Sequence, residues 1–132
     1  MSRLVLIVED NEICAETLQI ALELIPGVEV RSLPGTHAAI AILDEPGSEI
    51  AAIVTDLHLD WTTARGTGTG DGLDLIRQLR ANPRFVRLPI LLISGDSDPL
   101  LAERALAQGA DAFFPKPYSP SAVRRKLEQL LC

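Results

Sequence analysis

The sequence predicts a single three-layer α/β domain built on a parallel five-stranded sheet. Five short apolar runs alternate along the chain with five helical patterns. This alternation, with short links, indicates parallel strands joined by right-handed crossover connections. Three of the runs are almost wholly apolar, which is typical of strands that helices cover on both faces. The 132 residues suit one domain, which we expect to span 1–132.

The five predicted strands are the apolar runs themselves. The first, third and fourth contain mostly Val, Ile, Leu and Ala, whereas the second alternates apolar with polar residues, as an edge strand does. The runs cover Arg3–Val8, Val28–Leu33, Ala51–Thr55, Pro89–Ser94 and Asp111–Pro115.

Proline and glycine delimit the first three predicted helices. The first ends before Pro26, the second ends before Pro46, and the third stops at Asn82 because a residue that precedes proline avoids the helical region. These helices start near Asn11, Thr36 and Asp71, and the first extends to about Leu24. The first helix has an apolar stripe, which we expect to be its buried face, of Cys14, Leu18, Ala21 and Ile25.

Capping residues mark the last two helices. The fourth has Asp98 as its expected N-cap, Pro99 at its first helical position and Gly109 just beyond its end. The fifth repeats the start signal with Ser119 and Pro120.

The amino-acid composition argues against several classes of function. The formal net charge is −6, from 12 basic and 18 acidic residues, which argues against binding to nucleic acid and to an anionic membrane surface. No apolar run is long enough to span a membrane, and the first residues become acidic where a signal peptide would stay apolar. Cys14 and Cys132 have no metal-binding or redox spacing, so we expect a reduced, cytoplasmic compartment.

Polar residues follow four of the five predicted strands. Glu9 and Asp10 end the first strand, Asp56 the third and Ser94 the fourth, and Lys116 follows the fifth. In a sheet of this kind, ligands bind beyond the carboxyl ends of the strands, so we expect these side chains to converge. Three crowded carboxylates repel one another, and a hard divalent cation such as Mg²⁺ would relieve the repulsion.

The converging groups suit phosphoryl chemistry. An aspartate such as Asp56 can form an acyl phosphate, Ser94 can donate a hydrogen bond to a phosphoryl oxygen, and Lys116 can pair with its charge. Each residue alone has a simpler explanation, because acids before a helix cap it and a lone serine or lysine is usually a surface residue. The combination at four separate strand ends is what favours a site.

These residues resemble the receiver domain of bacterial two-component response regulators over nearly the whole chain. The resemblance implies a flavodoxin-like fold with strand order 2-1-3-4-5. The segments that carry it are "LVLIVEDNE", "IVTDLHL", "DGLDLIRQLR", "LPILLISG" and "GADAFFPKPYS".

The resemblance assigns roles around the third strand. It implies that Asp56 is the phosphoacceptor and that Mg²⁺ is held by Glu9, Asp10, Asp56 and the backbone carbonyl of His58. His58, together with Asp96, would also border the attacking water and tune dephosphorylation. The alternative for His58 and Asp96, that both are only exposed loop residues, stays open.

The resemblance also assigns the switch. It implies that Ser94 moves toward the phosphoryl group, that Lys116 contacts that group, and that the rotamer of Phe113 follows the serine. Because Phe113 has no hydroxyl group, any switching must act through packing. The Lys116–Pro117 bond is a candidate cis peptide.

One segment departs from the family. Asp71 and Gly72 come later than usual after Asp56, so Trp61–Gly68 is an apparent insertion between the third strand and the third helix. We expect either a flexible loop or a partner contact through Trp61 and Arg65. The Gly/Thr spacing lacks the ending of a phosphate-binding loop, which disfavours nucleotide binding.

The expected function is a phosphorylation-dependent signalling switch rather than an enzyme, with autodephosphorylation as its own reaction. A histidine kinase or histidine phosphotransfer domain would supply the phosphoryl group, and the change would reach a surface around the fourth helix, fifth strand and fifth helix. The resemblance allows a phosphorylation-dependent homodimer, a stand-alone regulator or the receiver of a hybrid kinase, and leaves the output protein unnamed. The alternatives are a receiver-like interaction module without phosphorylation and a Mg²⁺-dependent aspartyl phosphohydrolase, which would usually carry an acid where this chain has His58.

Overall fold

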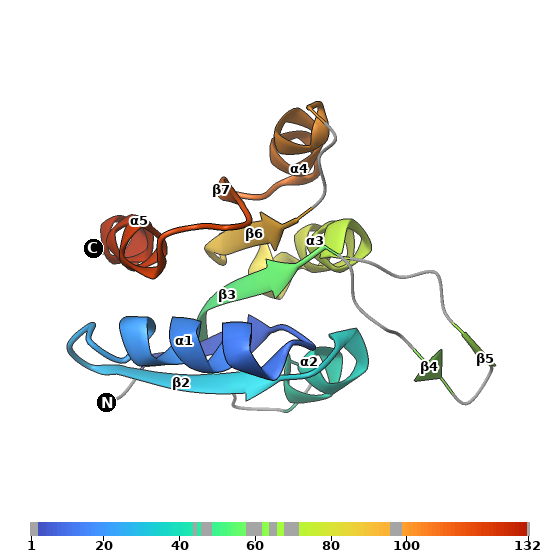
Figure 1. Ribbon diagram of the computed structural model, residues 1–132. Coiled ribbons are helices and arrows are strands. Elements are labelled where there is room, and N and C mark those ends of the chain that lie inside the picture. The colour runs from blue at the N-terminus through green and yellow to red at the C-terminus, as the bar shows by residue number, and fades with distance from the viewer. Residues whose placement is uncertain are drawn as a thin grey trace.

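The chain folds into one central sheet with helices on both of its faces (Figure 1). This computed structural model describes residues 3–43, 45, 49–57, 62–63, 66–67, 72–95 and 99–131. Among these residues, no helix has both the length and the apolar character needed to cross a membrane.

Five parallel strands form the central sheet. Their order, β2-β1-β3-β6-β7, confirms the predicted order, because β6 and β7 are the fourth and fifth strands of this sheet along the chain. As predicted, β2 lies at an edge. The strands are β1 (Arg3–Val8), β2 (Val28–Leu33), β3 (Ile50–Asp56), β6 (Ile90–Ser94) and β7 (Ala112–Pro115).

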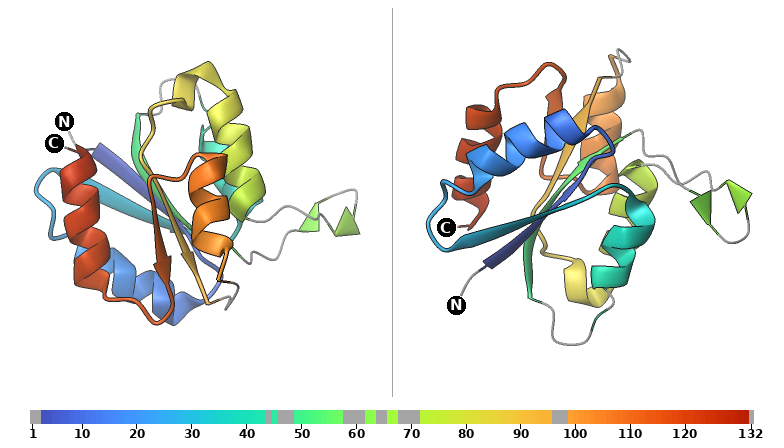
Figure 2. Two further views of the ribbon diagram at one scale, coloured as in Figure 1. Left: turned by 90° about the horizontal axis from the view of Figure 1, so that it is seen from above. Right: turned by 60° about the horizontal axis from the view of Figure 1, so that its bottom comes forward.

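Helices cover the sheet in two groups, which the turned views separate (Figure 2). One face carries α1 (Glu12–Leu22) and α5 (Pro120–Leu131). The other face carries α2 (Thr36–Leu43), α3 (Gly72–Ala81) and α4 (Leu101–Gln108), and a short 3₁₀ helix, η1 (Pro83–Phe85), follows α3.

Alternation along the strands divides the core into two layers. In β1, Val5 and Ile7 pack with α1 and α5, whereas Leu6 and Val8 pack with the helices of the other face. Successive side chains of a strand point to opposite faces, so a strand buried on both sides must be apolar at every position. This explains why the sequence of β1 reads as a continuous apolar run.

The start of α1 agrees with the sequence, but its end and its buried face differ. Asn11 is the N-cap, and its Oδ1 accepts the backbone N–H of Cys14 at 3.0 Å. The helix ends at Leu22, two residues before the predicted Leu24. Its buried residues are Ala15, Leu18 and Leu22. Cys14 and Ala21 of the predicted stripe are only half-buried, because the stripe is rotated around the helix from the predicted one.

The start of α4 is later than predicted. Pro99 lies in a turn instead of at the first helical position, because the first helical hydrogen bond runs from the N–H of Arg104 to the carbonyl of Leu100. The predicted cap Asp98 lies outside the described residues. Gly109 ends the helix with φ at 116°, a left-handed conformation that favours glycine, as expected.

The inserted segment contains a small antiparallel pair of strands that the sequence analysis did not predict. The pair is β4 (Thr62–Thr63) with β5 (Gly66–Thr67), and it projects away from the sheet (Figure 1). Trp61, Arg65 and Gly68 lie outside the described residues.

The insertion leaves and rejoins the fold at almost one point. The backbone N–H of Gly72, the first residue of α3, donates to the carbonyl of Leu57 at 2.8 Å. An added Cβ on Gly72 would lie 2.3 Å from the backbone oxygen of Asp56. Only glycine therefore lets α3 begin this close to the end of β3.

Replacing Gly72 by alanine should lower the free energy of unfolding by about 2 kcal/mol or more, because backbone must move to admit the methyl group. Urea unfolding measures the change. The matched control is Gly95→Ala, whose Cβ would lie 3.8 Å from the nearest side-chain atom and should change little. Equal effects of the two substitutions would contradict this account of Gly72.

Candidate functional site

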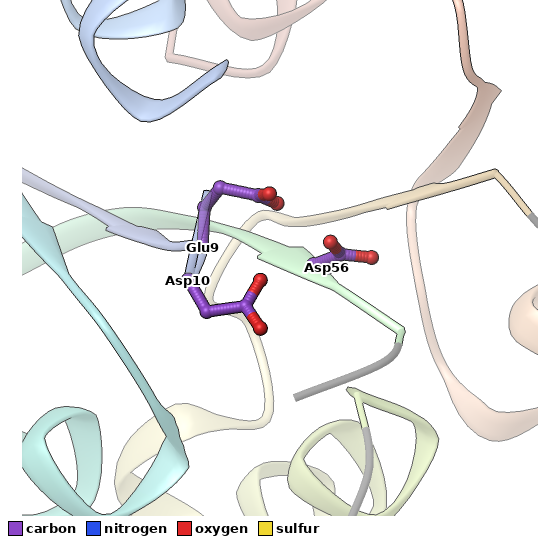
Figure 3. Close-up of side chains that lie close together, drawn as sticks. All are labelled: Glu9, Asp10 and Asp56. Carbon is purple, nitrogen blue, oxygen red and sulfur yellow. The ribbon is translucent and has the colours of Figure 1, made fainter. Parts of the chain in front are cut away.

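Three carboxylates meet at the ends of two adjacent strands (Figure 3). Glu9 and Asp10 directly follow β1, and Asp56 is the last residue of β3. One oxygen from each side chain lies within 4.8 Å of one from each of the others. The parallel pairing of β1 with β3 produces this convergence, as the sequence predicted for these three residues.

The three carboxylates differ in burial. Glu9 is 3% exposed and Asp56 is 5% exposed, whereas Asp10 is open to solvent. Removing a carboxylate from water is costly unless it is paired or hydrogen-bonded. The two buried acids therefore need a counter-charge from the protein or from a ligand.

Lys116 supplies part of that charge. Its Nζ lies 2.9 Å from Asp56 Oδ2 and 3.2 Å from each carboxylate oxygen of Glu9. The backbone N–H of Lys116 donates to the carbonyl of Ser94 at 2.7 Å, which fixes the residue beside the end of β6. The Lys116–Pro117 peptide bond is cis, as predicted.

The surroundings of the site raise the pKa of both Glu9 and Lys116, for different reasons. Burial raises the pKa of Glu9 to about 7, with a further rise from Asp56, while Lys116 opposes the shift. Burial lowers the pKa of Lys116, but its hydrogen bonds to Asp56 and Glu9 outweigh that effect and leave its pKa above the ordinary value. Lys116 is therefore charged at neutral pH, where the protonated and ionised forms of Glu9 are both present.

A backbone contact that the sequence analysis missed also holds Glu9. The N–H of Asn11 donates to Glu9 Oε1 at 3.3 Å, while the side chain of Asn11 caps α1. A nearby aromatic residue, Tyr118, is half-buried, and burial raises its pKa to about 12. The cap was readable from the sequence, but the contact with Glu9 depends on where the helix leaves the strand.

The donor set fits a hard cation. Three oxygen donors from two strand ends can approach one ion, and the exposure of Asp10 leaves that side accessible to water, which Mg²⁺ tends to retain. With all three acids ionised, their charge exceeds that of Lys116. The backbone carbonyl of His58, which was also predicted as a ligand, lies outside the described residues.

The predicted switch residues lie on the two neighbouring strands, β6 and β7. Ser94 is fully buried at the end of β6, and Phe113 is half-buried on β7. Phe113 packs against the core layer that includes Leu101 and Ala105 of α4. Asp96, the other predicted tuning residue, lies outside the described residues.

Comparison with known proteins identifies the family. The family model for the response regulator receiver domain matches residues 5–128. This chain belongs to the receiver domain family of two-component response regulators, whose members are signalling phosphoacceptors.

Two curated relatives illustrate the range of the family. The phosphate regulon transcriptional regulatory protein PhoB of Rhizobium meliloti is 30% identical over 126 residues, which cover 95% of this chain and 50% of that protein. The chemotaxis protein CheY1 of Helicobacter pylori is 34% identical over 61 residues, or 46% of this chain and 49% of that protein. The matched regions thus span about half the length of these relatives.

Solved structures agree with the fold. The receiver domain of a signal transduction histidine kinase from Syntrophus aciditrophicus is 28% identical, with a TM-score of 0.80 over 98% of this chain and 90% of that one. The chemotaxis response regulator CheY4 of Vibrio cholerae gives a TM-score of 0.80 at 20% identity, covering 99% of this chain and 100% of that one, and it supports the fold alone.

Replacing Glu9 by glutamine should stabilise the metal-free protein at neutral pH. The folded state keeps the Glu9 proton up to about pH 7 and the unfolded chain only up to pH 4.5. The folded state therefore loses stability as pH rises between these values, and the neutral variant escapes the loss.

Relative to wild type, Glu9→Gln should raise the free energy of unfolding by an amount that grows with pH. The increase should be near zero at about pH 4.5 and roughly 1–3 kcal/mol above pH 7, as measured by urea unfolding in the presence of a chelator. The control Glu16→Gln removes an exposed charge from α1. A gain that does not change with pH, or an equal gain from the control, would refute the assignment to Glu9.

Proposed function

We propose that this chain is a phosphorylation-dependent signalling switch that accepts a phosphoryl group on Asp56. The observation that carries the proposal is the buried Asp56 carboxylate, 2.9 Å from Lys116 and grouped with Glu9 and Asp10 at the carboxyl end of the sheet. Residues 1–132 would form one receiver, with the insertion at about 61–68 as an addition above the same site.

The phosphodonor is a histidine kinase or a histidine phosphotransfer domain. Receiver domains interact with proteins of these classes, and the family match supports the same for this chain. A carboxylate oxygen of Asp56 would attack the phosphorus atom while the bond from phosphorus to the donor histidine nitrogen breaks. The bonding electron pair leaves with the donor nitrogen, and with a proton on the other ring nitrogen of the phosphohistidine the products are an acyl phosphate on Asp56 and a neutral imidazole.

Magnesium is the cofactor that the acidic cluster would hold. Receiver domains bind Mg²⁺ at an acidic pocket, and Glu9, Asp10 and Asp56 would bind it here. When bound, the ion supplies positive charge that stabilises the transferring phosphoryl group. Asp10 is the accessible member of the cluster, because Glu9 is already engaged by Lys116 and by the backbone of Asn11.

The new anion would then change the packing behind the site. Lys116 already contacts Asp56 and would pair with the phosphoryl oxygens, and Ser94 would donate its hydroxyl to them. Phe113 packs against the core layer that includes α4, so its rearrangement would alter the surface of α4, β7 and α5. His58 and Asp96 remain the proposed residues that tune hydrolysis of the acyl phosphate.

Incubation with a small acyl-phosphate donor should add the mass of one phosphoryl group when Mg²⁺ is present and not when it is chelated. Intact mass spectrometry measures the gain. Asp56→Asn should remove it, whereas the control Asp74→Asn, which changes an acid on α3, should retain it. A folded wild-type chain that gains no mass would favour an interaction module without phosphorylation.

Replacing Asp10 by asparagine should weaken Mg²⁺ binding by about tenfold or more, because a neutral amide is a poorer ligand than a carboxylate. The shift of the thermal unfolding midpoint in a Mg²⁺ titration gives the affinity. Glu12→Gln is the matched control, since Glu12 is an exposed acid outside the cluster. Unchanged affinity in Asp10→Asn would exclude Asp10 as a ligand.

A further inference from the structure

Thr55 is a buried polar residue directly before the proposed phosphoacceptor. Its exposed fraction is 0%, and the residues of β3 that precede it are Ile, Ala and Val. A hydroxyl group loses its hydrogen bonds to water when it is buried, so it needs a partner inside the protein. Valine has nearly the same shape and carries no hydroxyl group to satisfy. The partner that the hydroxyl of Thr55 contacts therefore indicates what threonine does at this position.

The hydroxyl group contacts the backbone of Asp56. Thr55 Oγ1 donates a hydrogen bond to the backbone carbonyl oxygen of Asp56 at 3.0 Å. This oxygen belongs to the peptide group that joins Asp56 to Leu57. The hydroxyl of Thr55 thus acts on the backbone of the residue that carries the carboxylate.

Two other contacts restrain the same peptide group. The backbone N–H of Leu57 donates to the carbonyl of Ile93 on β6 at 3.0 Å. The oxygen of the group faces the start of α3, where an added Cβ on Gly72 would lie 2.3 Å from it. By alternation along β3, Thr55 points to the same face of the sheet as Ile53 and Leu57, which is the face that α3 covers. The peptide group is therefore held at its N–H by β6 and at its oxygen by Thr55, with α3 packed beside it.

The orientation of this peptide group affects where the carboxylate lies. It fixes the ψ angle of Asp56, and a change in that angle turns the residue relative to the sheet. In the structure, Asp56 Oδ2 lies 2.9 Å from Nζ of Lys116. A nucleophile reacts efficiently only when its attacking atom is held close to the reacting position, and a small displacement lowers the rate strongly.

We propose that Thr55 is a positioning residue, which holds the Asp56 carboxylate in place beside Lys116 through the backbone carbonyl of Asp56. This role rests on the proposed function of Asp56 as the phosphoacceptor. Without the hydroxyl group, the peptide group keeps its hydrogen bond to β6 but loses a donor to its oxygen, so it rotates more freely. The carboxylate then occupies a wider range of positions, and fewer of them suit attack on a phosphorus atom.

Two substitutions separate the hydroxyl group from the packing of the side chain. Thr55→Val keeps the shape and removes the hydroxyl group, whereas Thr55→Ser keeps the hydroxyl group and removes a methyl group. With acetyl phosphate and Mg²⁺, the rate of phosphoryl gain should fall by about tenfold in Thr55→Val and stay within about twofold of wild type in Thr55→Ser. Intact mass spectrometry over time gives the rates, and circular dichroism checks that each variant is folded.

The order of the two variants excludes a purely structural role. Serine leaves a methyl-sized cavity in the core, so Thr55→Ser should lower the thermal unfolding midpoint. If Thr55 only filled space, Thr55→Ser would therefore be the slower variant. Thr17→Val is the matched control, because Thr17 is exposed on α1 and its hydroxyl group also donates to a backbone carbonyl, that of Ile13 at 2.8 Å. The control should keep the wild-type rate.

A measurement without a phosphoryl group tests the positioning directly. In the metal-free protein, the NMR resonance of the Asp56 carboxyl carbon reports the surroundings of the carboxylate. Thr55→Val should shift this resonance, whereas Thr55→Ser and Thr17→Val should leave it unchanged. The resonance is assigned with Asp56→Asn, which removes it.

Equal phosphorylation rates in Thr55→Val and wild type would overturn the proposal, as would a Thr55→Ser variant as slow as Thr55→Val. A folded wild-type chain that takes up no phosphoryl group would refute the proposed function instead. The NMR measurement then decides the role of Thr55, because an unshifted Asp56 resonance in Thr55→Val would overturn it and a shifted one would support it.

Discussion

The site depends on one cation shared between two buried carboxylates. Lys116 follows β7, Glu9 follows β1, and two strands of the sheet separate them. The long lysine side chain spans that distance and contacts Glu9 and Asp56 together. One positive charge offsets the burial of two acids only in part, and the pKa of Glu9, raised to about 7, reflects the remaining cost. That unbalanced charge leaves an acidic cluster at the strand ends that could hold a metal ion.

The long insertion at this edge of the sheet is tolerated because it leaves and rejoins the fold at almost one point. The segment after Leu57 returns to Gly72, which donates a hydrogen bond to the carbonyl of Leu57. Entry and exit at one point mean that the added residues displace neither β3 nor α3. The entropic cost of closing a loop grows only slowly with its length, so a longer loop here need add little to that cost. Glycine at position 72 is the local requirement, because a side chain there would meet the backbone of Asp56.

Sequence reasoning succeeded where burial leaves few alternatives. The bounds of β1 and β2 agree with the predicted runs, because a strand covered on both faces must be apolar throughout and a loop cannot be. The convergence of Glu9, Asp10 and Asp56 followed from parallel topology alone. The α1 helix was harder, since its apolar residues extend well beyond a single stripe. Hydropathy could not distinguish the stripe with Cys14 from the one with Ala15 and Leu22, and only packing against the sheet decides which is buried.

The apolar residues of α1 lie both in the core and on the surface of the molecule. Apolar residues that the core does not bury, including Ile13 and Ile20, are exposed to solvent, and Ile13 lines a hollow that Lys116 also lines. Lys116 therefore borders both the carboxylate cluster and this exposed apolar surface.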